Sequence, residues 1–271
     1  MRIIQPAAKK QLGQHFLHDS GIIEKIVRAV NPQPGERLVE IGPGHGAITL
    51  PLLRRHGALT VIEFDRDLIA PLSEAAHGIG ELTIIHKDVL MVDFGRLADD
   101  GQEQRQLRLV GNLPYNISSP ILFHALAFAE SIVDMHFMLQ KEVVDRMAAA
   151  PGSKVYGRLS VMLQAYCSVT PLFRVPPGAF RPPPKVDSAV VRLLPKPAAQ
   201  IGIDDATAFA DVVRDAFGQR RKTLRNALSK LCEAEDFALV GVRPEARAEQ
   251  LAVNEFIALG NHLAVKRAAL Q

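Results

Sequence analysis

Cysteine is scarce in this chain, since Cys167 and Cys232 are the only two among 271 residues. They fit neither a disulfide framework nor the ligand spacing of a zinc site, which favours a reducing, cytosolic compartment. The nine histidines show no metal-ligand pattern either. We therefore expect no metal site, and we expect Cys167, which follows an apolar run, to pack in the core.

Long apolar runs are also missing. No run approaches the length of a membrane-spanning helix, and the first residues lack the apolar stretch of a secretory signal. The sequence contains no internal repeat and no low-complexity segment. These absences predict a cytoplasmic protein that has no membrane partner.

The net charge of +3 is too small to indicate nucleic-acid binding by itself, but the basic residues are unevenly distributed. Between residues 214 and 230, six Lys and Arg residues accompany the single acid Asp215. Apolar residues recur there at helical spacing, which predicts one amphipathic helix with a basic face. Such a face suits RNA phosphates, and an ordinary solvated helix face is the alternative. The residues predicted to bind RNA are Arg220, Arg221, Lys222 and Arg225.

Hydrophobic residues make up 48% of the chain, which is enough for a large core. Strand and helix patterns alternate through the first half of the sequence. Two further strands are predicted at 169–175 and 186–194, on either side of the proline-rich loop 176–185. Only helical patterns follow. We therefore predict an α/β domain over 1–198 and a small all-helical domain over 199–271.

A glycine-rich loop follows the first predicted strand. The apolar run 38–41 precedes Gly42, Gly44 and Gly46, and a helical pattern comes next. Glycines at this place let a ligand approach the backbone at a helix N-terminus. Their spacing lacks the third glycine of the dinucleotide fingerprint, which argues against NAD. By itself the loop is equally consistent with a tight turn.

Acids end the next two predicted strands. Glu63 lies about 20 residues beyond the glycine loop, where an acid usually grips the ribose of a nucleotide through its hydroxyls. Asp88 follows a third apolar run and is placed to meet an adenine edge. Ligands of open α/β sheets bind outside the carboxyl ends of the strands. Together these groups predict a nucleotide-like cofactor at that edge.

The fourth strand end carries Asn112, Leu113, Pro114 and Tyr115. The side-chain oxygen of Asn112 and the carbonyl oxygen of Pro114 can accept hydrogen bonds from an exocyclic amine. The Tyr115 ring can stack on a flat base. This turn therefore suits chemistry on an adenine amino group beside a bound cofactor.

These motifs, taken together, resemble those of the ribosomal RNA adenine dimethyltransferases, and most of all the bacterial enzymes of the small subunit. Within the family pattern, Leu12 stands where phenylalanine is usual, and His15 where asparagine is commoner. The similarity runs in order from about residue 9 to about residue 254. The segments that carry it are 10–17, 40–46, 112–115, 138–144, 156–160, 180–188 and 219–226.

The resemblance implies a Rossmann-like class I methyltransferase sheet and S-adenosylmethionine as the methyl donor. It further implies that the protein dimethylates two adjacent adenosines near the 3′ end of 16S rRNA, in the small ribosomal subunit or its precursor. We expect the protein to act as a monomer. The helical domain 199–271 is expected to bind the RNA.

The resemblance also assigns the site residues. His15 and Leu17 are expected to close over the methionine end of the cofactor, and Asn112 both to contact it and to hold the amine. Phe180 is expected to project from its proline-rich loop and to sandwich the target base with Tyr115; packing under the loop is the alternative. The expected cofactor-binding residues are His15, Leu17, Gly42, Glu63, Asp88 and Asn112, and the expected catalytic residues are Asn112, Pro114, Tyr115 and Phe180.

Several other functions are consistent with parts of this pattern. A large-subunit rRNA adenine methyltransferase shares the core motifs, but the long C-terminal segment and the motif after Phe180 favour the small-subunit type. A DNA adenine methyltransferase more usually has an acid in place of Asn112. A ribosome-assembly factor with secondary catalysis also stays open. The glycine spacing makes a nicotinamide oxidoreductase the least consistent of these functions.

Overall fold

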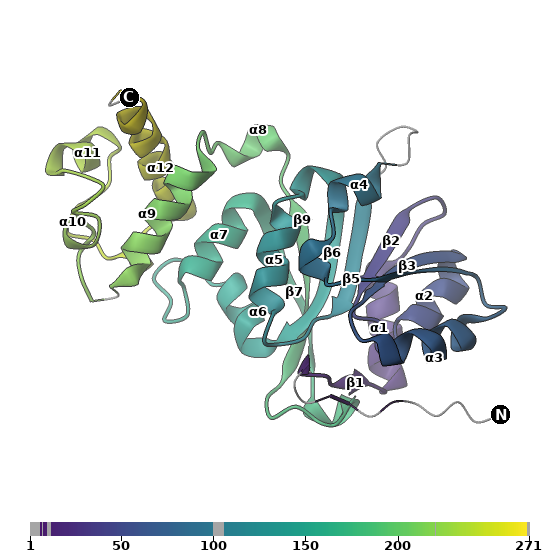
Figure 1. Cartoon of the computed structure of the whole chain (residues 1–271). Coiled ribbons are helices and arrows are strands. Elements are labelled where there is room, and N and C mark those ends of the chain that lie inside the picture. Colours follow the sequence, from purple (N-terminus) through teal and green to yellow (C-terminus); the bar gives the residue numbers. More distant parts are fainter. Residues whose placement is uncertain (1–5, 7, 10–11, 100–105, 220, 270–271) are drawn as a thin grey trace. The chain divides into compact units, whose positions relative to one another are not determined.

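The computed structural model describes residues 6, 8–9, 12–99, 106–219 and 221–269 (Figure 1). The chain forms two compact units. The first unit combines Met1–Val144 with Thr170–Pro195, and the second combines Asp145–Val169 with Lys196–Gln271. This division differs from a single boundary at residue 198, because Asp145–Val169 groups with the C-terminal helices.

A seven-stranded sheet with the order β4-β3-β2-β5-β6-β9-β7 organises the first unit. The first five strands in this order are parallel, and β9 runs antiparallel to β6. Parallel pairing requires crossover connections, which the intervening helices provide. The predicted α/β class is therefore confirmed. The strands are β2 (Arg37–Ile41), β3 (Ala58–Glu63), β4 (Glu81–His86), β5 (Leu107–Asn112), β6 (Ile132–Gln140), β7 (Cys167–Val175) and β9 (Ser188–Pro195).

Helices and short 3-10 turns connect these strands. The first helix shows why they form where they do: the side chain of Asp19 accepts a hydrogen bond from the backbone N–H of Ile22 at 2.9 Å and so caps its N-terminus. The helix ends at Asn31, whose φ of 43° is left-handed. The elements are α1 (Ser20–Val30), α2 (Thr49–His56), α3 (Arg66–Ala76), η2 (Val89–Met91), α4 (Phe94–Ala98), α5 (Ser118–Leu126), η3 (Ala129–Ser131) and α6 (Lys141–Met147).

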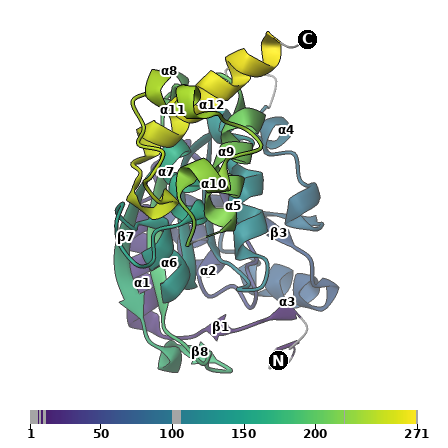
Figure 2. The same cartoon turned by 90° about the vertical axis from the view of Figure 1, so that its left-hand side faces the viewer.

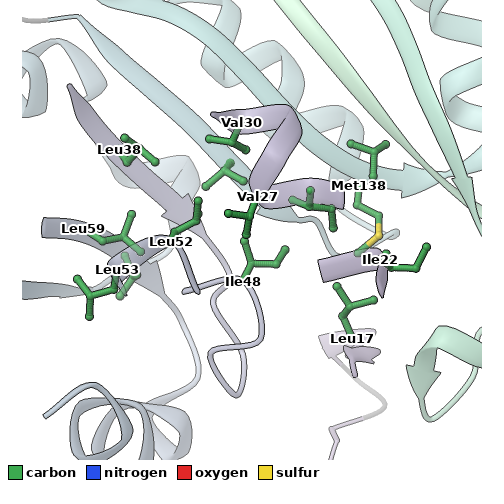
Figure 3. Close-up of a cluster of buried hydrophobic side chains, with 14 of the residues drawn as sticks. Leu17, Ile22, Val27, Val30, Leu38, Ile48, Leu52, Leu53, Leu59 and Met138 are labelled. Carbon is green, nitrogen blue, oxygen red and sulfur yellow. The ribbon is translucent and has the colours of Figure 1, made fainter. Parts of the chain in front are cut away.

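One hydrophobic cluster packs residues of α1, α2 and α3 against the sheet. Figure 3 shows the part of it around Val27, Leu52 and Leu38. Val27 of α1 and Leu52 of α2 meet Leu38 of β2, and all three are at most 3% exposed. Burying each such side chain contributes roughly 1.5–3 kcal/mol. The cluster thereby fixes the glycine loop, which lies between β2 and α2.

A largely buried charge network joins the start of β5 to β6 and β9. The Arg108 guanidinium donates to both oxygens of Asp134, at 2.9 and 3.0 Å, and Arg192 donates to Asp134 at 3.0 Å. Arg108 also donates to Glu36 at 2.6 Å. Burial alone would raise the pKa of Asp134, but the hydrogen bonds from Arg108 and the nearby positive charges lower it. The network therefore binds β5, β6 and β9 together.

We expect Asp134→Ala to destabilise the protein by about 3–5 kcal/mol, because it leaves the largely buried Arg108 charge without its main partner. Urea unfolding measures this effect. The control is Glu24→Ala, which breaks the exposed ion pair with Arg28 and should cost at most about 1 kcal/mol. Equal losses in the two variants would contradict a structural role for the network.

The second unit is helical, and its core is aromatic. Phe209 of α9 and Phe256 of α12 are fully buried. Helices α9 and α12 approach so closely that a Cβ at Gly260 would come within 2.8 Å of the Phe209 backbone. Cys167, at the start of β7, is also buried, as predicted. The helices are α7 (Arg158–Tyr166), α8 (Ala198–Ile201), α9 (Ala206–Gly218), α10 (Leu224–Ala227), α11 (Ala234–Leu239) and α12 (Val253–Ala268).

The prediction of one amphipathic helix between residues 214 and 230 is wrong. Helix α9 ends at Gly218, and α10 begins only at Leu224. Glycine is a poor residue inside a helix and a common one near a helix end, so the apolar spacing continues across a break in the backbone. Of the basic residues that the structure describes here, Arg214 lies on α9, Arg221 and Lys222 lie between the two helices, and Arg225 lies on α10, so they do not share one helical face.

Candidate active site

A cavity of about 300 Å³ lies at the carboxyl ends of the parallel strands β2, β3, β4 and β5. This is where an open α/β sheet binds its ligands. The cavity brings together all six of the residues predicted to bind the cofactor, and two of the predicted catalytic residues besides Asn112. The predicted residues that line it are His15, Leu17, Gly42, Glu63, Asp88, Asn112, Pro114 and Tyr115.

The glycine loop forms one wall of the cavity. Gly42, Gly44 and Gly46 all have left-handed backbone, with φ of 69°, 57° and 84°. A Cβ at Gly44 would come within 3.0 Å of the Phe16 ring, and one at Gly46 within 2.9 Å of a Leu72 methyl. The left-handed backbone favours glycine at all three positions, and Gly42 and Gly44 line the cavity with bare backbone, here called the glycine cradle.

Two acids line the cavity beside this loop. Glu63 is 6% exposed, and one of its oxygens accepts from the backbone N–H of Asp65 at 2.7 Å. Burial raises its pKa, although backbone hydrogen bonds oppose the shift. Glu40 is 1% exposed and accepts from the Thr49 hydroxyl at 2.6 Å. Burial raises the pKa of Glu40 to about 8. Glu63 is thus the more accessible of the two for a hydroxyl ligand.

Sequence reasoning missed two residues of this wall. Glu40 lines the cavity from the end of β2, and Phe64 lines it directly after Glu63. The Phe64 ring is 61% exposed, which is unusual for so large an apolar side chain. An exposed aromatic residue directly after a strand-end acid could have indicated a stacking surface for a flat ring.

The turn after β5 forms the opposite wall. Asn112 donates through Nδ2 to the backbone carbonyl of His15 at 2.9 Å. The Tyr115 hydroxyl lies 2.6 Å from the Ser188 hydroxyl, and burial raises the Tyr115 pKa. The Pro114 carbonyl accepts from the backbone N–H of Ile117 at 3.2 Å, and since a carbonyl has two lone pairs it can accept once more.

Phe180 does not line the cavity. It is 2% exposed and packs in the same hydrophobic cluster as Leu17 and Met138. The reason is a short antiparallel pairing of β1 (Phe16–Leu17) with β8 (Phe180–Arg181), shown in Figure 2, which sets Phe180 opposite Leu17. The expectation that its ring projects over the catalytic turn is therefore corrected, and the alternative of packing under the loop describes its position.

The predicted RNA-binding residues lie in the second unit. Arg221, Lys222 and Arg225 are exposed, and Arg220 lies outside the described residues. The closest acid to Arg225 is Glu245, with 3.9 Å between Nη2 and Oε1, which is a weak ion pair. These three cations are therefore accessible to an anionic partner.

Within the described ranges, no group of three or more His, Cys, Asp or Glu side chains could hold a metal ion. None of the helices described is both long enough and apolar enough to span a bilayer.

Known proteins match this chain over nearly its whole length. The family model of ribosomal RNA adenine dimethylases matches residues 6–264. Two proteins named ribosomal RNA small subunit methyltransferase A, from Xanthomonas campestris pv. campestris (strain B100) and Xanthomonas oryzae pv. oryzae (strain PXO99A), are each 72% identical over 254 residues. The alignment covers 94% of this chain and 95% of each relative.

Solved structures show the same fold. A dimethyladenosine transferase from Plasmodium falciparum superposes with a TM-score of 0.77 at 25% identity, covering 90% of this chain and 96% of that one. The 23S rRNA methyltransferase ErmE superposes with a TM-score of 0.69 at 23% identity, covering 92% and 99%. With a Rossmann-like sheet and a family match across both units, this chain belongs to the ribosomal RNA adenine dimethylase family of methyltransferases.

Proposed function

We propose that this protein uses S-adenosylmethionine to dimethylate the exocyclic amines of two adjacent adenosines near the 3′ end of 16S rRNA, in the small ribosomal subunit or its precursor. The observation that carries the proposal is the convergence of a glycine cradle, Glu63, Asp88 and the Asn112 turn on one cavity. Relatives at 72% identity are named for the small subunit, which favours that substrate over the large subunit.

The cavity fits the proposed cofactor. Gly42 and Gly44 line the cavity with backbone that carries no side chain, and Glu63 can accept hydrogen bonds from ribose hydroxyls. Asp88 faces the adenine edge, and His15 and Leu17 close over the methionine end. When bound, the cofactor supplies an electrophilic methyl group on sulfur.

The Asn112 turn aligns the amine that receives this methyl group. The Asn112 side-chain oxygen and the Pro114 carbonyl accept its hydrogens, which draws the nitrogen lone pair out of conjugation with the ring. Extruding the base costs roughly a few kcal/mol, and stacking on Tyr115 returns about 1–3 kcal/mol. Positioning and electrostatic alignment supply the catalysis, and the amine loses its proton to water after attack.

We assign substrate affinity to the cations of the second unit, Arg221, Lys222 and Arg225, which hold phosphates without reading bases. The protein acts on the cytoplasmic ribosomal subunit as a monomer. Because these side chains are exposed and weakly paired, their contacts should dominate the salt dependence of binding.

We expect the double substitution Arg221→Ala and Arg225→Ala to weaken binding to small subunits and to lower the salt slope by about two, one for each lost phosphate contact. Filter binding at several salt concentrations measures both quantities. The control is Arg28→Ala with Arg96→Ala, two exposed arginines of the first unit that pair with acids on or beside their own helices. An unchanged slope in the first variant would mean that its cations form an ordinary solvated surface.

The decisive experiment for the proposed function is transfer of labelled methyl groups from S-adenosylmethionine to immature small subunits, followed by mapping of the modified nucleotides. Two adjacent dimethyladenosines near the 3′ end of 16S rRNA are expected. Label found only in large-subunit rRNA would favour a large-subunit rRNA adenine methyltransferase. Tight binding to subunits without any transfer would favour an assembly factor.

A further inference from the structure

The segment formed by residues 12–17, here called the strap, lines the cavity and contacts the catalytic turn. The backbone carbonyl of His15 accepts from Nδ2 of Asn112 at 2.9 Å, although 97 residues separate the two. Because a carbonyl can only accept, the Asn112 amide must point its NH2 group toward the strap. The oxygen Oδ1, the proposed acceptor of the substrate amine, therefore turns away from the strap.

The His15 ring holds that carbonyl in place. It stacks on Tyr115, with ring centroids 5.6 Å apart and an interplanar angle of 29°. Its Nδ1 lies 2.8 Å from the Pro182 carbonyl, so this nitrogen carries a proton and donates. The next two residues of the strap pair with β8, Phe16 opposite Arg181 and Leu17 opposite Phe180. The ring and the strand pairing thus fix His15 from two directions.

Through Gln14 the strap also contacts the acids beside the proposed ribose site. Gln14 donates to Asp65 at 3.0 Å, and Lys9, which precedes the strap in the sequence, pairs with the same Asp65 at 2.6 Å. Asp65 in turn donates its backbone N–H to Glu63. One short segment therefore contacts both the cofactor-side acids and the amine acceptor.

We infer that His15 is a positioning residue for methyl transfer: its ring, held by Tyr115 and Pro182, keeps its carbonyl on Asn112 and so keeps Oδ1 of Asn112 toward the substrate amine. The inference rests on the proposed function, because it takes Asn112 as the amine acceptor. His15 acts through Asn112 and touches no reacting atom in this role.

The test is single-turnover methyl transfer to small subunits at saturating S-adenosylmethionine. His15→Ala should slow the saturated rate by about 10- to 100-fold, the usual cost of a misplaced reacting group. His15→Phe keeps a ring on Tyr115 and should recover part of the rate. The control is His18→Ala, since His18 is an exposed histidine three residues along the chain and should leave the rate unchanged. Thermal unfolding establishes that each variant is folded.

A double substitution separates positioning from a general structural effect. If His15 acts through Asn112, then adding His15→Ala to Asn112→Ala should cause little further loss of rate, whereas independent effects would multiply. Multiplied losses, or a saturated rate of His15→Ala equal to that of the parent, would overturn the inference. A faster rate would also overturn it, because the His15 ring would then be blocking the Tyr115 surface on which the target base stacks. If the parent protein itself fails to methylate small subunits, the proposed function fails instead.

Discussion

Asn112→Ala should lower the single-turnover rate of methyl transfer by roughly 100- to 1,000-fold, the range seen when one preorganised transition-state contact is removed from an enzyme. The reason is that Oδ1 aligns the amine only while the methyl group moves. The fold should tolerate the change, because the one side-chain hydrogen bond described for Asn112 goes to the His15 carbonyl and is worth about 1 kcal/mol.

The control for this prediction is Asn254→Ala, which removes an exposed asparagine from α12 in the second unit. Its rate, stability and RNA affinity should match those of the parent. Asn112→Ala should match the parent in RNA affinity and lose only about 1 kcal/mol of stability. Substantial methyl transfer by Asn112→Ala would mean that another group accepts the amine, and the proposed mechanism would then have to be rebuilt.

Glu63→Ala should weaken S-adenosylmethionine binding by about 10- to 100-fold, since hydrogen bonds to a charged acceptor contribute about 1.5–3 kcal/mol. RNA affinity should not change, because Glu63 lines the part of the cavity proposed to hold the cofactor. Calorimetric titration of the folded variant measures the effect. Glu24→Ala, an exposed carboxylate on α1, is the control. Unchanged cofactor affinity in Glu63→Ala would remove Glu63 from the site.

The same assignment predicts a pH dependence. Burial raises the pKa of Glu63, so its carboxylate gains a proton at a higher pH than an exposed glutamate does. Cofactor affinity should therefore fall as the pH is lowered through that raised pKa, because the protonated acid loses acceptor capacity. Glu63→Gln should bind weakly at every pH and lose this dependence. An identical pH profile in the parent and Glu63→Gln would assign the titration to another group.

The sequence predicted the cavity better than it predicted the side chains packed around it. Gly42, Glu63, Asp88 and Asn112 were identified from one rule, that parallel strands present their carboxyl ends at the same edge of a sheet. That rule needs only periodicity and spacing. The contact of Asn112 with His15 depends on chain segments far apart in sequence, and no local pattern predicts it.

The incorrect predictions have the same origin. Phe180 lies in a polar, proline-rich loop, so its burial depends on pairing with Leu17 across the fold. The apolar residues from Phe217 to Leu231 are spaced as in one helix, yet α9 ends at Gly218 and a separate helix, α10, begins at Leu224. For Phe180, tertiary pairing overrode the local signal, whereas the helix break follows a local signal, Gly218, that the apolar spacing alone does not register.

The two-ended attachment of the strap has a consequence for successive turnovers. Each methyl group consumes one cofactor, so a dimethylated adenosine requires the cavity to be emptied and loaded twice. The segment proposed to close over the cofactor also carries the His15 carbonyl that accepts from Asn112. On the proposed mechanism, reloading moves this segment and so breaks its contact with the amine acceptor. We expect the reaction to be distributive, with monomethyladenosine accumulating early in a time course and converting later to the dimethylated product.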